Sequence, residues 1–177
     1  MNLIIKISDS DIGEKTYEIH NPNTRYAVRT ILLNDNGEIA VLNKSKKNEY
    51  KLIGGGIEGH ESLEQALRRE VIEEAGCEID ILAELGYVEE YQTVNNFVQT
   101  SYVYVAKVRK DTKKLHLTKQ EKDEGAQLCW YKPNIALQHI KDSYNKLIPS
   151  KYSNLYSSRM VVKRDSLILK YYLDYIL

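Results

Sequence analysis

One stretch of the chain decides its fold, residues 54–77, with the sequence GGGIEGHESLEQALRREVIEEAGC. The run Tyr50-Lys51-Leu52-Ile53 precedes it and predicts a short strand that stops at the three glycines. Ser62 followed by Gln65 forms a capping-box pattern, which is typical of a helix N-terminus. Gly76 is a residue of the kind that ends helices. The stretch therefore predicts a strand, a glycine loop and a helix.

The predicted helix carries carboxylates on its apolar face. At about 100° per residue, three apolar side chains form one stripe, and these are Leu63, Ala66 and Leu67. Glu70 and Glu74 fall inside the same stripe, and Glu73 lies at its edge. Like charges at this spacing destabilise a helix by a few tenths of a kcal/mol per pair, and burial without compensation costs several kcal/mol each. We therefore expect a positive charge against this face in the folded protein.

Two interpretations of these acids are open. In one, Arg69 pairs with Glu73 at i, i+4 and the remaining acids face solvent. In the other, the acids form a site for a hard divalent cation, Mg²⁺ or Mn²⁺, which takes oxygen ligands. Arg69 supplies one charge against three, which favours the metal site. The glycines alone indicate only a tight turn, but backbone without side chains can also approach a phosphate. Loop and helix together indicate metal-assisted phosphate chemistry.

The rest of the chain predicts a mixed sheet covered by helices. Strands are expected at residues 3–7, 26–33, 38–42, 50–53, 78–92, 98–108 and 127–131, and helices at 62–75, 133–145 and 158–176. Strands and helices that interleave in this way favour an α/β or α+β sandwich.

Composition excludes several classes of protein. The 177 residues include 25 Lys and Arg and 25 Asp and Glu, and zero net charge argues against a protein that coats nucleic-acid polymers or anionic membranes. No apolar run is long enough for a membrane span, and no signal-peptide pattern is evident at the start. Two cysteines are too few for a disulfide framework. We expect a cytoplasmic monomer or dimer.

The neutral total hides an uneven distribution of charge. The formal net charge is +1 over residues 1–57, −9 over 58–106 and +8 over 107–177. An acidic middle would attract metal ions, and a basic C-terminal part would help to steer a polyanionic substrate towards the protein.

Residues 55–77 resemble the signature of the Nudix hydrolases, a family that includes MutT-like enzymes. Its box is G-x5-E-x7-R-E-U-x-E-E-x-G-U, where U is a bulky apolar residue. Every spacing is kept, with the matching residues Gly55, Glu61, Arg69, Glu70, Val71, Glu73, Glu74, Gly76 and Cys77. Ile53 stands where many members have Pro, and His60 where many have Gly. Both departures lie in the loop that shapes the approach of a phosphate.

The resemblance implies an α/β/α sandwich that hydrolyses a nucleoside diphosphate linked to another group, with Mg²⁺ as cofactor. It assigns Glu70, Glu73 and Glu74 to the metal site and to catalysis, and the carbonyl of Gly54 as a further ligand. Gly55 and Gly56 are expected to lie against the substrate phosphates. Glu61 and Arg69 are expected to form a structural ion pair. We expect one Nudix domain over residues 1–177, with an N-terminal extension at 1–24 and a C-terminal helical extension at 146–177.

Residues outside the box complete the expected site. Many members supply another acid from the loop before the last strand, where this chain has Glu124 and Glu121, in that order of preference; a solvated charged loop is the alternative. Either of these acids or Glu70 would act as the general base. Arg25 and Arg29, on the first central strand, are expected to reach phosphates or else to pair with nearby acids.

The identity of the substrate is open. Tyr91, Phe97, Tyr102 and Tyr104 would either stack on a base or pack within the sheet. A nucleoside triphosphate, a nucleotide sugar and an ADP-ribose-like compound fit equally well. A non-catalytic nucleotide-binding or sensing domain is the alternative function, although three crowded carboxylates favour an enzyme. The many apolar residues of the C-terminal extension would close over the sheet or form a homodimer contact.

Overall fold

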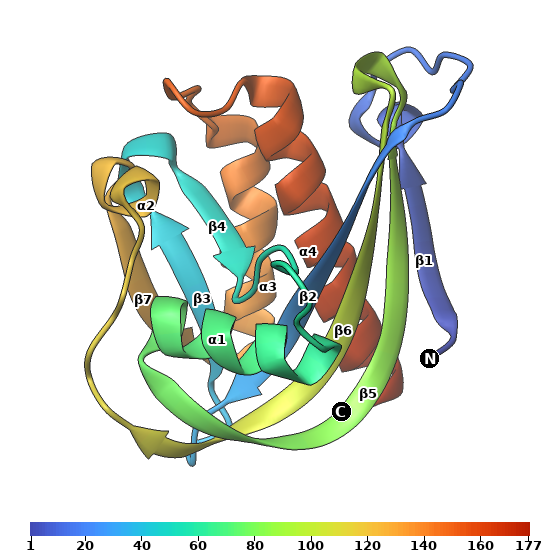
Figure 1. Ribbon diagram of the computed structural model, residues 1–177. Helices are drawn as coiled ribbons and strands as arrows, with labels where there is room; N and C mark the ends of the chain where they lie inside the picture. The colour runs from blue at the N-terminus through green and yellow to red at the C-terminus, as the bar shows by residue number, and fades with distance from the viewer.

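The computed structural model, which describes residues 1–177, contains seven strands and four α-helices (Figure 1). The strands are β1 (Leu3–Ser8), β2 (Asn23–Leu33), β3 (Ile39–Lys44), β4 (Glu49–Leu52), β5 (Cys77–Gln92), β6 (Phe97–Asp111) and β7 (Ala126–Tyr131). The helices are α1 (Leu63–Ala75), α2 (Lys119–Asp123), α3 (Pro133–Ser143) and α4 (Leu155–Tyr175). The predicted α/β sandwich with an extra C-terminal helix is confirmed.

The strands form one mixed sheet in the order β1-β5-β6-β2-β3-β4, with β7 paired to β3. β1 runs parallel to β5, and β2 runs parallel to β6. The predicted hairpin between β2 and β3 pairs only at Leu33 and Ile39, so the two strands diverge beyond their turn. The chain that follows β4 enters this gap, where the N–H groups of Thr30 and Val28 donate to the carbonyls of Ile53 and Gly55. The glycine loop is thereby held against the middle of the sheet.

Helices cover both faces of the sheet. α1 lies in front of the sheet in Figure 1, and α3 and α4 lie behind it. Successive side chains of a strand point to opposite faces, so Val28 and Leu32 of β2 join the core beneath α1, whereas Ile31 joins the core beneath α3 and α4. In β4 the same alternation sends Leu52 towards α3 and α4 and leaves Lys51 on the side of α1.

Packing of α4 accounts for the apolar C-terminal stretch. Four of its side chains are buried in the core shared with α3 and the sheet, namely Val162, Ile168, Leu169 and Tyr172. The helix therefore closes over the sheet, the first of the two expected arrangements, and a homodimer contact stays a prediction. No helix combines the length and apolar character needed to cross a lipid bilayer.

Local signals set the ends of α1 as predicted. The Ser62 side chain accepts from the Gln65 N–H at 3.2 Å, and the Gln65 side chain accepts from the Ser62 N–H at 2.8 Å. Gly76 ends the helix in the left-handed conformation, with φ of 64°. α2 arises in a segment that we expect to be a charged loop. Thr118 and Glu121 form a second capping box there, a pattern that is readable in the sequence.

An ion pair anchors the loop between β4 and α1. Arg69 reaches back from α1 and donates from Nε to Oε1 of Glu61 at 2.7 Å and from Nη2 to Oε2 at 3.0 Å. The same Nη2 donates to the carbonyl of Gly56 at 2.8 Å. These hydrogen bonds from Arg69, together with one from the backbone of Glu58, lower the pKa of Glu61 to about 2.

We expect Glu61→Gln to lower stability in a pH-dependent way. The folded-state pKa of Glu61 lies below its ordinary value of 4.5. The ionised pair therefore stabilises the protein above about pH 4.5, and that contribution is lost as the pH falls towards about 2. Urea unfolding should show a deficit for the variant at neutral pH that shrinks as the pH is lowered to about 3. Glu64→Gln is the matched control, because Glu64 pairs with Arg68 on the exposed face of the same helix. A deficit that does not change with pH would contradict this assignment.

Candidate functional site

A cavity of about 500 Å³ opens between the glycine loop, α1, α2 and the N-terminal half of α4. Only Ile57 and Val161 line it with apolar side chains. The acids that line it are Glu49, Glu58, Glu70, Glu73, Glu74 and Glu121, and the bases are Arg25, Arg29, Lys44, Lys47, Lys51, Arg69 and Arg164. A lining of this kind suits a charged ligand rather than an apolar one.

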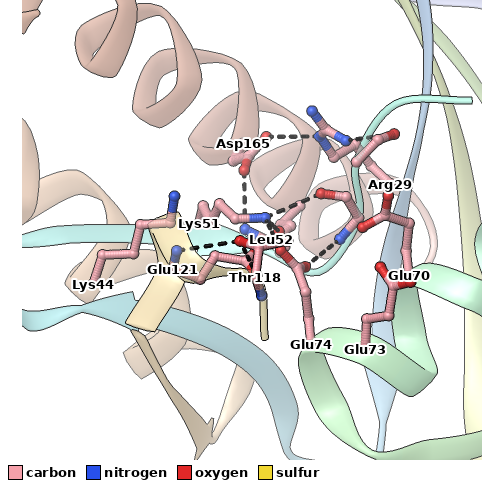
Figure 2. A network of polar contacts seen from close by, with 12 residues as sticks. Arg29, Lys44, Lys51, Leu52, Glu70, Glu73, Glu74, Thr118, Glu121 and Asp165 are labelled. Carbon is pink, nitrogen blue, oxygen red and sulfur yellow. Dashed lines mark hydrogen bonds and ion pairs between the residues drawn. The ribbon is translucent and has the colours of Figure 1, made fainter. Parts of the chain in front are cut away.

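Glu74 is buried in this lining, with 2% of its surface exposed. Its Oε1 accepts from Nζ of Lys51 at 2.7 Å, and its Oε2 accepts from the N–H of Gly54 at 2.8 Å (Figure 2). Burial raises the pKa of Glu74 to about 7 and outweighs the opposing effect of these two partners. The expected burial of this carboxylate on the apolar face of α1 is therefore observed.

Lys51 supplies the positive charge that the sequence requires against α1. Besides Glu74, its ammonium donates to the carbonyl of Gly54 at 3.0 Å. It therefore lies between two groups that we expect to be metal ligands. Sequence reasoning missed this residue; the available signal is a lysine inside the otherwise apolar strand Tyr50–Ile53, on the side of the sheet that faces α1.

Glu70 and Glu73 lie one turn or less from Glu74, and Arg69 contacts both. Nη1 of Arg69 donates to Glu70 Oε1 at 2.8 Å and to Glu73 Oε2 at 3.3 Å. Glu70 is buried and Glu73 is partly exposed. Burial raises the pKa of Glu73, and Arg69 opposes this shift. The Arg69–Glu73 pair of the first interpretation is present, but Glu70 and Glu74 do not face solvent as that interpretation requires.

Each glycine of the loop lies against a different neighbour, and the neighbour of Gly54 is backbone. Gly54 has φ of 136° and lies so close to the carbonyl of Val28 that a Cβ would overlap it. A Cβ on Gly55 would overlap the carboxylate of Glu70, and one on Gly56 would meet the guanidinium of Arg25. The loop therefore brings bare backbone against both an acid and a base of the cavity.

The two candidate acids outside the box lie in different places. Glu121, at the end of the cavity nearest Lys51, accepts from the N–H of Thr118 at 2.8 Å. Burial raises its pKa, but the Thr118 hydrogen bonds, Glu74 and Lys51 outweigh this effect and hold the pKa below its ordinary value. Glu121 is thus a neighbour of Glu74 and Lys51, and Figure 2 shows it next to Thr118.

Glu124 lies outside the cavity lining, in a buried cluster of its own. Its carboxylate accepts from Nζ of Lys44 at 2.9 Å and from the hydroxyl of Ser150 at 2.6 Å. Lys47 is a further neighbour at 3.8 Å. The structure thus brings Glu121, and not Glu124, to the carboxylates of α1.

The two arginines of β2 both line the cavity, but Arg29 is buried and Arg25 is exposed. Arg29 is buried, its Nη1 donates to the carbonyl of Val28 at 2.6 Å, and its Nε lies 4.0 Å from Asp165. Burial, reinforced by Arg164, lowers the pKa of Arg29 to about 10, against the effect of Asp165 and Glu74. Arg25 is exposed and has no ion pair or hydrogen bond through its side chain.

The aromatic residues considered for base stacking belong to the sheet. Tyr104 is buried in the core beneath α1, and Tyr102 stacks on Tyr26 with the ring centroids 6.5 Å apart. Neither of them, nor Tyr91 or Phe97, lines the cavity. Cross-strand packing therefore accounts for the two tyrosines of β6.

The oxygen donors of the cavity fit a hard divalent cation in chemical type. Glu70, Glu73, Glu74, Glu121 and the carbonyl of Gly54 all face it, and hard cations prefer such ligands. No three acidic, histidine or cysteine side chains converge as a ready-made metal cluster, however. Lys51 and Arg69 contact these carboxylates instead, so a metal that bound there would have to displace them.

Comparison with known proteins identifies the family. The model of the NUDIX domain matches residues 23–150. The crystal structure of the MutT protein from Methanosarcina mazei Go1 has a TM-score of 0.51 and 20% identity, over 82% of this chain and 94% of that one. The solution structure of the E. coli ORF135 protein has a TM-score of 0.50 and 20% identity, over 84% of this chain and 92% of that one. No curated protein matches in sequence. The two structures share the fold, and the match over residues 23–150, which contains the box on the glycine loop and α1, makes this chain a member of the Nudix family.

Proposed function

We propose that this protein is a metal-dependent pyrophosphohydrolase. Its substrate is a nucleoside diphosphate linked to another group, as in a nucleoside triphosphate, a nucleotide sugar or an ADP-ribose-like compound. One observation carries the proposal: Glu70 and Glu74 are buried in the wall of a charged cavity, beside Glu73 and Glu121. Burial of several carboxylates at one point costs free energy unless they pair with or coordinate cations.

Different residues of the cavity would bind the metal ion, bind the phosphates and accept the proton. Glu70, Glu73, Glu74 and the carbonyl of Gly54 would hold Mg²⁺, with Mn²⁺ as a substitute, and Glu121 adds a further carboxylate beside Glu74. The bound ion would neutralise diphosphate oxygens and lower the pKa of a water molecule. Arg25, which lines the cavity beside the bare backbone of Gly56 and has no ion pair, would bind a phosphate. Glu70 or Glu121 would accept the proton from the attacking water.

The direct test incubates the purified protein with Mg²⁺ and a panel of diphosphate compounds, and identifies the products. We expect hydrolysis of at least one compound. Glu70→Gln and Glu74→Gln should lower kcat by roughly a hundredfold or more, because each removes a charge that acts on the reacting groups. Glu64→Gln, on the exposed face of the same helix, should retain full activity. Tight nucleotide binding without turnover of any compound would instead identify a non-catalytic binding domain.

Glu121 and Glu124 are separated by comparing their glutamine variants. Glu121→Gln should lower kcat and leave the free energy of unfolding nearly unchanged, because its carboxylate lies at the cavity. Glu124→Gln should destabilise the protein by about 2 kcal/mol, since buried hydrogen bonds to the charged Lys44 are weakened, and should spare kcat at a temperature where the variant is folded. Urea unfolding and initial rates measure the two effects. Loss of kcat in a folded Glu124→Gln variant would reverse the assignment.

Substitution of Lys51 tests whether its ammonium group and Mg²⁺ compete for the carboxylate of Glu74. Lys51→Met leaves a buried carboxylate without its partner, which costs about 3 kcal/mol. We expect this loss in EDTA and a partial recovery when Mg²⁺ is added, with a lower apparent Kd for Mg²⁺ than in the wild type. Urea unfolding across a Mg²⁺ titration measures both quantities. Lys107→Met, which breaks an exposed pair with Asp35, is the control. Equal Mg²⁺ affinity in Lys51→Met and wild type would show that Lys51 does not compete with the ion.

A further inference from the structure

Most of the buried polar atoms without a hydrogen-bond partner belong to residues that line the cavity. Only five buried side-chain nitrogen or oxygen atoms in the structure have no hydrogen-bond partner. Four of them belong to residues of the cavity lining, namely Arg29 Nε, Ser153 Oγ, Ser158 Oγ and Arg164 Nη2. The fifth, Thr30 Oγ1, belongs to a residue outside it. Buried polar groups in proteins are nearly always paired, so this concentration points to a ligand that completes the pairing.

α4 supplies two of these atoms, those of Ser158 and Arg164, and Ser153 lies just before the helix. Ser157, Ser158, Val161 and Arg164 all line the cavity, and their spacing places them on one side of a helix. Ser153 and the N-cap residue Asn154 bring the N-terminus of this 21-residue helix to the same place. α4 lies beyond residues 23–150, which match the NUDIX domain. This wall of the cavity therefore lies outside the segment that matches the NUDIX domain.

Buried acids fix the two guanidinium groups in position. Arg164 is only 2% exposed; its Nη1 donates to Glu90 at 3.1 Å and its Nε donates to Asp165 at 2.8 Å. Asp165 also accepts from the N–H of Leu52 at 2.9 Å and lies 4.0 Å from Nε of Arg29. Glu90 and Asp165 thus orient both arginines and leave Nη2 of Arg164 without an acceptor.

The chemistry of the unpaired atoms indicates an anion with several oxygens. The two nitrogens can only donate hydrogen bonds, and the two hydroxyls can donate as well. A helix N-terminus adds a partial positive charge and favours phosphate in particular. Since Glu90 and Asp165 already balance the two guanidinium charges, the anion is recognised by directed hydrogen bonds rather than by excess charge.

We propose that the N-terminal half of α4 and Arg29 form a subsite for a phosphate group of the substrate, opposite the carboxylates of α1. The proposal rests on the proposed function, because it takes this phosphate to belong to the hydrolysed diphosphate compound. A substrate that fills the subsite carries a phosphate in addition to those held beside the carboxylates. The subsite therefore favours a nucleoside triphosphate over a nucleoside diphosphate linked to a neutral sugar.

Binding of inorganic phosphate in EDTA tests the subsite without turnover or metal. Isothermal titration calorimetry should show Ser158→Ala binding phosphate about tenfold more weakly than the wild type, because one hydrogen bond to a charged group is lost. Arg164→Lys, which keeps the charge beside Glu90 and Asp165 but lacks the guanidinium Nη2, should weaken binding at least as much.

Thr30→Val is the matched control: it removes the one unpaired hydroxyl outside the cavity and should bind phosphate like the wild type. Ser158→Ala should unfold at the same or a higher urea concentration than the wild type, since no hydrogen bond is lost from the free protein. Equal phosphate binding in wild type, Ser158→Ala and Arg164→Lys, or no binding by the wild type, would overturn the proposal.

Steady-state kinetics distinguish an incorrect subsite assignment from an incorrect proposed function. Ser158→Ala should lower kcat/KM about tenfold for a nucleoside triphosphate and leave that for a nucleoside diphosphate linked to a neutral sugar unchanged. Equal effects on the two substrates would overturn the subsite while turnover itself supports the enzyme. If no compound is hydrolysed but the variants still lose phosphate binding, the subsite stands and the proposed function falls.

Discussion

The burial of Glu74 is the constraint on which the rest of the site depends. A carboxylate with 2% of its surface exposed must have partners, and it takes one from each side: the ammonium of Lys51 and the N–H of Gly54. The second partner is available only because Gly54 adopts a backbone conformation with φ of 136°, beside the carbonyl of Val28. One buried charge therefore fixes the end of β4, the first glycine of the loop and the rotation of α1 about its axis.

The features that the sequence predicted are those with a local cause. Ser62, Gln65 and Gly76 bound α1 because capping needs only neighbouring residues. The helical period alone placed Glu70 and Glu74 on the buried face. The identity of their partners could not be predicted in this way, because Lys51 meets Glu74 across 23 residues of chain. The sequence also could not show which of Glu121 and Glu124 reaches the cavity. The two residues are three positions apart, Glu121 within α2 and Glu124 at its C-terminal end, and the helix turn places Glu121 at the cavity and Glu124 against Lys44.

Charge that is segregated along the chain is paired in space. Some acidic residues of 58–106 pair with Arg68 or Arg69 of the same segment, and others meet bases from elsewhere, as Glu74 meets Lys51 and Glu90 meets Arg164. The basic C-terminal part does not act only as a diffuse positive surface, because its Arg164 is buried beside the cavity. Zero net charge is thus compatible with a site that presents acids on α1 and unpaired donors on α4. Such an arrangement matches the two ends of a metal-bound polyphosphate better than a uniformly charged cleft would.

Asp165 connects the two sides of the cavity. Its carboxylate accepts from Arg164 of the same helix and from the N–H of Leu52, the residue that follows Lys51 in β4. α4 is thereby tied to the strand that carries the partner of Glu74. A buried network of this kind contributes little net stability, and its members instead fix the position of the groups they contact. The unpaired donors of α4 and the crowded acids of α1 both leave the free protein less stable than a fully paired one would be. A ligand that pairs with both sides at once would relieve both costs.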